Sequence, residues 1–164
     1  EDLLNSFEQI YKSKWLSMMG SKLGFAETGK EDEKLITDLL DWMHKNSADF
    51  TNTFLNLCKE EIPDGALYAS ESFQSWHVRW QNRLRKEEQG LKTSFALMRS
   101  VNPAVIPRNH KVDEALQAGE EGNFKPFHDL LNAVEKPYVD GDHLLPFQAP
   151  PEPGEKVMQT FCGT

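Results

Sequence analysis

Residues 102–116 of the chain read Asn-Pro-Ala-Val-Ile-Pro-Arg-Asn-His-Lys-Val-Asp-Glu-Ala-Leu, and this stretch divides an otherwise helical sequence. Each proline lacks a backbone N–H and pushes the residue before it out of the helical region, so Asn102 and Ile106 are expected to be extended or turn-like. The stretch therefore predicts a corner at which one group of helices ends and another helix begins.

The length and the net charge of the chain exclude some kinds of binding partner. The chain has 164 residues and a formal net charge of −8 at pH 7. That length is enough for a packed core, and that charge repels phosphate backbones, so nucleic acid is not expected as a partner. No apolar run reaches the roughly 20 residues that a membrane-spanning helix needs, so no membrane is expected as a partner either.

The first residues carry no secretory signal, which favours a cytoplasmic location in a bacterial-type protein. They also lack an initiator methionine, and the helical spacing of apolar residues is already under way at Leu3. We therefore expect the chain to be a piece of a longer protein.

Apolar residues recur at helical spacing through the first hundred residues. A helix over residues 3–23 is expected to bury a wide face made of Leu3, Leu4, Phe7, Ile10, Tyr11, Trp15, Met18 and Met19. The second helix should bury Leu35, Ile36, Leu39, Leu40 and Met43. The third, capped by Ser47 or Asp49, should have on one side Phe50, Thr53, Phe54, Leu57 and Cys58. The fourth should bury Phe73, Trp76, Trp80 and Leu84. Gly90 either ends this fourth helix or is tolerated within it.

Two short helices are expected after the corner, and Pro137 should end the second. From there on the sequence is rich in proline and glycine, so residues 137–164 are expected to form an extended tail without a regular element. No period-two alternation is present. The predicted fold is all-α, a bundle of about six to seven amphipathic helices, with residues 1–136 as a helical domain and 137–164 as the tail.

Two groups of charged residues are candidates for binding, and each has a structural alternative that we favour. His110 beside Arg108 and Asn109 could bind an anion. Alternatively, Asn109 or His110 caps the following helix while Arg108 bonds exposed carbonyl groups at the corner.

The second group is a basic run near two tryptophans, Trp76 and Trp80, and consists of Arg79, Arg83, Arg85 and Lys86. Cations mixed with aromatic rings suit nucleic acid or phosphate. Alternatively, the tryptophans lie in the core and the charges form a solvated face with Glu87 and Glu88 as partners.

No catalytic, nucleotide-binding or metal-binding residue is expected within the chain. Its five histidines never form a pair at metal-ligand spacing on one helix face. The sequence has no phosphate-binding Gly-x-x-x-x-Gly-Lys loop and no Gly-x-Ser-x-Gly nucleophile elbow.

The two cysteines are expected to differ. Cys58 shares a helical face with apolar residues and should be a small, inert core residue. Cys162 stands third from the end of the tail, where a thiol should be accessible and mobile. It is the candidate redox residue, and the alternative is a harmless terminal cysteine. The few cysteines argue against a disulfide scaffold and suit a reducing compartment.

Several stretches, taken together and in order, resemble the C-terminal part of the selenoprotein O family, kinase-like proteins described as protein adenylyltransferases. Lys22-Leu23-Gly24 at the end of the first helix and the segment 48–54 both resemble family segments. The residues Asn102, Pro103, Arg108 and Asn109 match a family signature, and Pro150-Pro151-Glu152 with Cys162 resembles the family's C-terminal end.

The resemblance implies a larger protein-kinase-like fold that binds ATP with magnesium or manganese and transfers AMP to Ser, Thr or Tyr hydroxyls of protein substrates. It implies that the residues binding ATP and metal lie in a missing N-terminal kinase-like core, the expected partner of this chain. Within the chain it implies a redox role for Cys162 alone, and we expect Asn102, Pro103, Arg108 and Asn109 to be structural.

A rival hypothesis is a free-standing helical-hairpin module that binds proteins and has no enzymatic activity. The helix pair over residues 114–134 resembles a tetratricopeptide hairpin, although no repeat of about 34 residues is present. If the chain is instead part of a larger lobe, some aromatic residues assigned to the core should form an exposed apolar patch.

Overall fold

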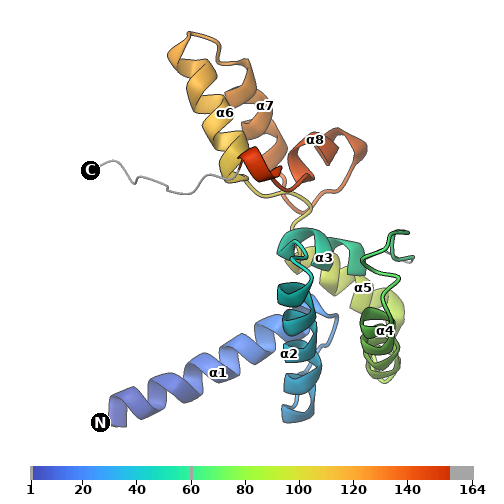
Figure 1. The fold of residues 1–164 in the computed structure, drawn as a ribbon. Coiled ribbons are helices and arrows are strands. Elements are labelled where there is room, and N and C mark those ends of the chain that lie inside the picture. Colours follow the sequence, from blue (N-terminus) through green and yellow to red (C-terminus); the bar gives the residue numbers. More distant parts are fainter. Residues whose placement is uncertain (1, 60, 156–164) are drawn as a thin grey trace. The chain divides into compact units, whose positions relative to one another are not determined.

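The computed structural model describes residues 2–59 and 61–155, and the side chains from residue 6 on. Within these ranges the regular elements are eight α-helices and two 3-10 helices (Figure 1), and no strand occurs among the described residues. The predicted all-α class is confirmed. The chain forms two compact units, Glu1–Asn102 and Pro103–Thr164, which divide inside the predicted corner. A separate tail beginning at residue 137 stays a prediction.

Unit 1 (Glu1–Asn102) contains five helices: α1 (Asp2–Lys22), α2 (Lys30–Lys45), α3 (Phe50–Leu57), α4 (Glu71–Leu84) and α5 (Gly90–Val101). Its core holds the largest fully buried side chains, which are Trp76, Trp80, Phe25, Phe54, Phe73, Met19, Leu23, Ile36, Leu39, Leu57, Leu84 and Met98. The predicted inner face of the fourth helix is confirmed, because all four of its residues belong to this set.

Two tryptophans of α4 join this helix to the rest of unit 1. The Trp76 indole N–H donates to the Leu35 carbonyl at 2.8 Å, and that of Trp80 donates to the Leu23 carbonyl at 3.0 Å. The two rings lie nearly parallel, with centroids 6.0 Å apart. Because a buried indole N–H needs an acceptor, these bonds set the position of α4 against α2 and against the end of α1.

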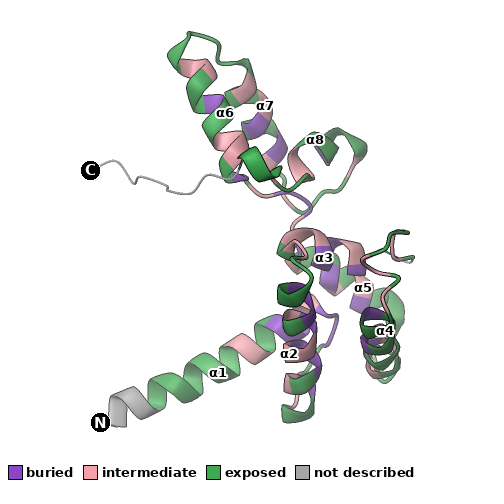
Figure 2. Ribbon diagram, in the orientation of Figure 1, coloured by how far each residue is buried: buried purple, intermediate pink, exposed green. Residues whose placement is uncertain are grey.

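The wide buried face expected for α1 is wrong for Phe7, Ile10, Tyr11 and Met18, and the side chains of Leu3 and Leu4 lie outside the described residues. Only its C-terminal end enters the core, through Met19 and the half-buried Trp15 and Leu16 (Figure 2). The exposed apolar side chains of α1 are Phe7 at 67%, Tyr11 at 61%, Ile10 at 59% and Met18 at 50% of their full exposure. The rings of Phe7 and Tyr11 stack with centroids 6.3 Å apart. The expected exposed apolar patch is therefore confirmed.

Local signals at two helix ends agree with the observed geometry. The Asp49 carboxylate accepts a hydrogen bond from the Asn52 backbone N–H at 2.8 Å, so Asp49 is the cap of α3. Gly90 is the first residue of α5 and has φ +77°, a left-handed conformation that glycine adopts without strain. Gly90 therefore lies at a break between α4 and α5. Phe50, expected on the inner side of α3, is 45% exposed.

Unit 2 (Pro103–Thr164) is built on a helical hairpin of α6 (Asn109–Glu120) and α7 (Lys125–Val134). Gly122, with φ +84°, lies in the turn between them. Ala115 of α6 and Leu130 and Ala133 of α7 are buried. None of the described helices of either unit is long and apolar enough to cross a membrane.

The expectation that residues 137–164 hold no regular element is wrong for residues 137–155. Three short helices follow α7: η1 (Asp142–Leu144), α8 (Leu145–Gln148) and η2 (Pro153–Glu155). Pro146 stands in the first turn of α8, where a missing N–H costs no intrahelical hydrogen bond. Leu144, 1% exposed, anchors the segment. Cys162 lies outside the described residues.

The cap of α3 can be tested directly. We expect Asp49→Ala to lower the free energy of unfolding by about 1 kcal/mol, because the Asn52 N–H then loses its acceptor. Asp49→Asn keeps an oxygen acceptor at the same position and should cost only a fraction of that. Chemical denaturation of the two variants measures the difference, and equal destabilisation would show that the cap bond is not the cause.

Candidate functional site

The first of two clusters of buried polar groups in unit 1 surrounds the guanidinium of Arg83. Its Nε lies 2.7 Å from one carboxylate oxygen of Asp32 and its Nη2 3.2 Å from the other, and its Nη1 lies 2.6 Å from Glu87. The exposed fraction of the side chain is 22% for Arg83, 2% for Asp32 and 7% for Glu87. The predicted solvated face is therefore wrong for Arg83, which reaches back into the unit to pair with α2.

The same cluster holds the segment between α1 and α2. Arg83 Nη2 donates to the Glu27 carbonyl at 3.1 Å, and its guanidinium lies 4.4 Å from the ring centroid of Phe25. The Ala26 N–H donates to Glu87 at 2.9 Å. Although burial lowers the pKa of Arg83, its hydrogen bonds with Asp32 and Glu87 raise that pKa above its usual value.

These contacts decide between the two interpretations of the basic run. Arg83 uses its donors on carboxylates and a carbonyl, and Arg79 lies 2.8 Å from Asp38 of α2. Trp76 and Trp80 are both 2% exposed, so their faces are not available for stacking with a base. The favoured alternative is correct for the tryptophans, which lie in the core.

A second polar cluster, the Lys22–Asn102 joint, lies where α1, α3 and α5 end. Lys22 Nζ donates to Asn102 Oδ1 and to the Val101 carbonyl, each at 3.2 Å. In return Asn102 Nδ2 donates to the Lys22 carbonyl at 2.9 Å and lies 3.5 Å from Cys58 Sγ. Asn102 is 2% exposed, so an amide buried among these groups replaces water with protein partners.

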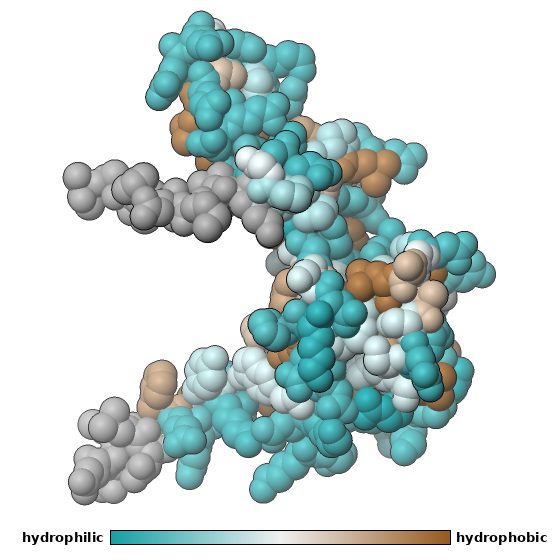
Figure 3. All heavy atoms as spheres, viewed as in Figure 1, coloured by the Kyte–Doolittle hydropathy of each residue, from teal (hydrophilic) through white to brown (hydrophobic). Residues whose placement is uncertain are grey.

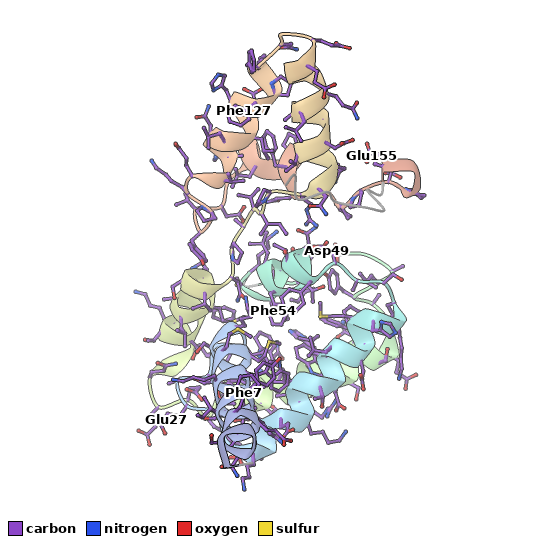
Figure 4. All side chains as sticks on the ribbon, turned by 90° about the vertical axis from the view of Figure 1, so that its left-hand side faces the viewer. Phe7, Glu27, Asp49, Phe54, Phe127 and Glu155 are labelled. Carbon is purple, nitrogen blue, oxygen red and sulfur yellow. The ribbon has the colours of Figure 1, made fainter. Side chains whose placement is uncertain are left out.

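Lys22 and Cys58 are the two titratable groups of this joint. Burial lowers the pKa of Lys22, and the charge interaction with Cys58 opposes that shift. Lys22 Nζ also lies 5.5 Å from the ring centroid of Phe54. Figure 4 labels Phe54, whose side chain lies inside unit 1. Cys58 is 5% exposed and its Sγ lies 3.2 Å from the Phe54 carbonyl. Cys58 therefore occupies the core position that the sequence predicts.

In unit 2 the signature residue Arg108 bonds a backbone carbonyl, as expected, but the carbonyl is that of Gln148, outside the corner of residues 102–116. Arg108 is 8% exposed, and its Nη2 donates to the Gln148 carbonyl at 2.8 Å. The expected cap is wrong, because α6 begins at Asn109, its cap position is Arg108, and no side-chain cap bond forms there. Pro103 is half-buried and Asn109 is exposed. The structural role of these signature residues stays a prediction.

His110 borders an open hollow of about 410 Å³ on unit 2. The acidic residues lining it are Asp113, Glu114, Glu121 and Glu155. Four carboxylates repel an anion, so the geometry opposes the anion-binding hypothesis for His110. Among the described residues, no group of three or more His, Cys, Asp or Glu side chains is arranged to hold a metal ion.

Sequence reasoning missed two of the residues that organise unit 1. Asp32 is buried in the first turn of α2, and its carboxylate accepts from the Gly29 N–H at 2.9 Å. An acidic residue three positions after a glycine cap is a recognisable start signal, and it could have singled out Asp32. Lys22 carries no such signal, because a lysine in the last turn of a helix is normally solvated.

The described residues define an all-helical chain whose buried charges join its own helices. Its relatives are nucleotidyltransferases by name. Protein nucleotidyltransferase YdiU of Alcanivorax borkumensis is 51% identical over 162 residues, which cover 98% of this chain and 34% of that protein. Proteins of the same name in Nitrosococcus oceani and Clostridium botulinum strain Okra are 43% and 44% identical over the whole chain, again 34% of their length.

The model of the family described as protein adenylyltransferase SelO matches residues 1–135, so the chain belongs to this family. The resemblance to selenoprotein O is thereby confirmed. The chain spans about a third of the length of the curated relatives it matches.

Two substitutions, one inside the Lys22–Asn102 joint and one outside it, test the role of Asn102. Asn102→Ala should lower the free energy of unfolding by about 1–3 kcal/mol, because the Lys22 carbonyl and ammonium lose a partner in a buried site. Asn109→Ala, at an exposed position of the same signature, should change it by less than about 0.5 kcal/mol. Urea titrations monitored by circular dichroism compare the two, and similar values would contradict the assigned role of Asn102.

The two thiols should react at different rates under native conditions. Cys58 is buried, so a thiol reagent should label it only on unfolding, whereas Cys162 should react at once. Single variants Cys58→Ser and Cys162→Ser assign the two phases in a stopped-flow labelling experiment. Equal rates for the two thiols would remove the distinction between a core cysteine and a tail cysteine.

Proposed function

We propose that the longer protein carrying this chain transfers AMP from ATP to Ser, Thr or Tyr hydroxyls of other proteins, and that this chain is its C-terminal helical part. The observation that carries the proposal is the family match over residues 1–135. In this proposal ATP and magnesium or manganese bind to a kinase-like N-terminal core outside the chain.

We further propose that the chain itself is structural or regulatory and contributes no catalytic group. The internal pairing of its best-placed cations supports this, because Arg83 and Lys22 are engaged by Asp32, Glu87 and Asn102. The chain covers 34% of each relative, so about two thirds of the length of these relatives remains in which a nucleotide site can lie. A cytoplasmic location and a redox role for Cys162 belong to the same proposal and rest on the sequence alone.

The rival function, a free-standing helical-hairpin binding module, has one observation in its favour. The hairpin of unit 2 exposes large apolar side chains, which are Leu116, Phe124, Phe127 and Leu131. In Figure 3 apolar side chains reach the surface among polar ones. The match of the whole chain to relatives named as nucleotidyltransferases favours the first proposal.

An AMP-transfer assay tests the proposal. The full-length protein, given ATP labelled on its α-phosphate together with Mg²⁺ or Mn²⁺, should attach labelled AMP to protein hydroxyls, and a chelator should abolish the transfer. The 164-residue chain alone should transfer none. Label on protein is read by gel and located by mass spectrometry. Transfer by the isolated chain, or none by an intact full-length protein, would contradict the proposal.

A further inference from the structure

The apolar residues of α1 lie on two different faces of the helix. Those that pack on the core of unit 1 are Trp15, Leu16 and Met19, followed by Leu23 just after the helix. From Leu16, steps of four and three residues toward the N-terminus lead to Lys12, Glu8 and Asn5, all of them polar, whereas steps of four from the half-buried Trp15 lead to Tyr11 and Phe7. The face of α1 that packs on the core is therefore apolar only in the C-terminal half of the helix.

The second face is the apolar stripe, which we define as Phe7, Ile10, Tyr11 and Met18. Ile10 and Tyr11 follow Phe7 by three and four residues, and Met18 follows Tyr11 by seven, which places them along one side of the helix. All four are at least half exposed, whereas Met19, the neighbour of Met18 on the core face, is 2% exposed. A stripe of this kind, two of whose rings already stack on each other, is typical of a contact surface rather than of scattered exposed residues.

An exposed ion pair connects the middle of α1 to α2. Lys12 lies 2.8 Å from Glu33 of α2, but this pair is exposed, at 60% and 35% of the two side chains, and such pairs contribute little. Helices shorter than about 12–15 residues are marginal in water without tertiary packing. Figure 1 shows this half of α1 extending beyond α2, so a helix here needs a further surface to pack on.

We propose that the apolar stripe of α1 is an intramolecular docking surface for the part of the longer protein outside residues 1–164. The inference rests on the proposed function insofar as both require a longer protein. The occupant follows from the length of the missing chain, because the matched relatives extend about three times as far as this chain. Lys14 lies among the stripe positions, so the facing surface is apolar with a polar group or water opposite this ammonium.

Matched charge insertions in the full-length protein test the docking. The double variant Phe7→Glu with Tyr11→Glu places two carboxylates in the stripe and should lower the melting temperature by several degrees. The control, Gln9→Glu with Ser13→Glu, adds the same charge at the same spacing on exposed positions outside the stripe and should leave it within about one degree. Equal shifts for the two variants would overturn the proposal.

A photocrosslink keeps the test decisive if the charged variant does not fold. Full-length protein with p-benzoylphenylalanine in place of Tyr11 should, on irradiation, form a crosslink within one polypeptide to a peptide outside residues 1–164. Crosslinks between two copies would make a second copy the occupant, and the absence of any crosslink would leave the stripe in water. Either result overturns the inference. Because neither readout measures AMP transfer, the docking surface and the proposed function can fail independently.

Discussion

The guanidinium of Arg83 is the contact on which unit 1 depends most. It joins α4 to Asp32 of α2, to Glu87 after α4, and to the Glu27 carbonyl in the segment between α1 and α2. Asp32 and Glu87 are almost fully buried, so each carboxylate has exchanged water for this cation and a backbone N–H, that of Gly29 for Asp32 and that of Ala26 for Glu87. Removing a single member would leave a buried charge uncompensated, which in comparable sites costs several kcal/mol. The cluster therefore holds α4 next to α2 and next to the segment between α1 and α2, and it is not an exposed surface ion pair.

The Lys22–Asn102 joint repeats this principle at the C-terminal ends of α1 and α5. A lysine with a pKa lowered by burial and a buried amide exchange hydrogen bonds across a sequence separation of 80 residues. Asn102 immediately precedes Pro103, which cannot continue a helix, so Asn102 is the C-cap of α5 while its side chain binds the end of α1. One residue of the family signature, Asn102, thus makes buried contacts within unit 1.

The elements that were predicted correctly are those determined by the spacing and type of their own residues. The spacing of Phe73, Trp76, Trp80 and Leu84 places one continuous face in the core, and the Asp49 cap depends on a contact three residues away. The first helix was misjudged because periodicity shows that a face is apolar but not which partner covers it. Arg83 was misjudged because a charged residue among other charges looks solvated until its distant carboxylates are known. The short helix α8 was missed because Pro146 suggested a break where it marks a beginning.

These observations distinguish two kinds of surface within one chain. Inside unit 1, the ion pairs of Arg83 and the indole hydrogen bonds join groups of residues 22–102 to one another, and the apolar core also takes in Met19 of α1. In the N-terminal half of α1, by contrast, Phe7, Ile10 and Tyr11 are exposed. A chain shaped to function alone would place polar residues there, since exposed apolar area of this kind promotes association. Membership of a family whose matched relatives are about three times as long supports the proposal that a segment of the longer protein covers this face.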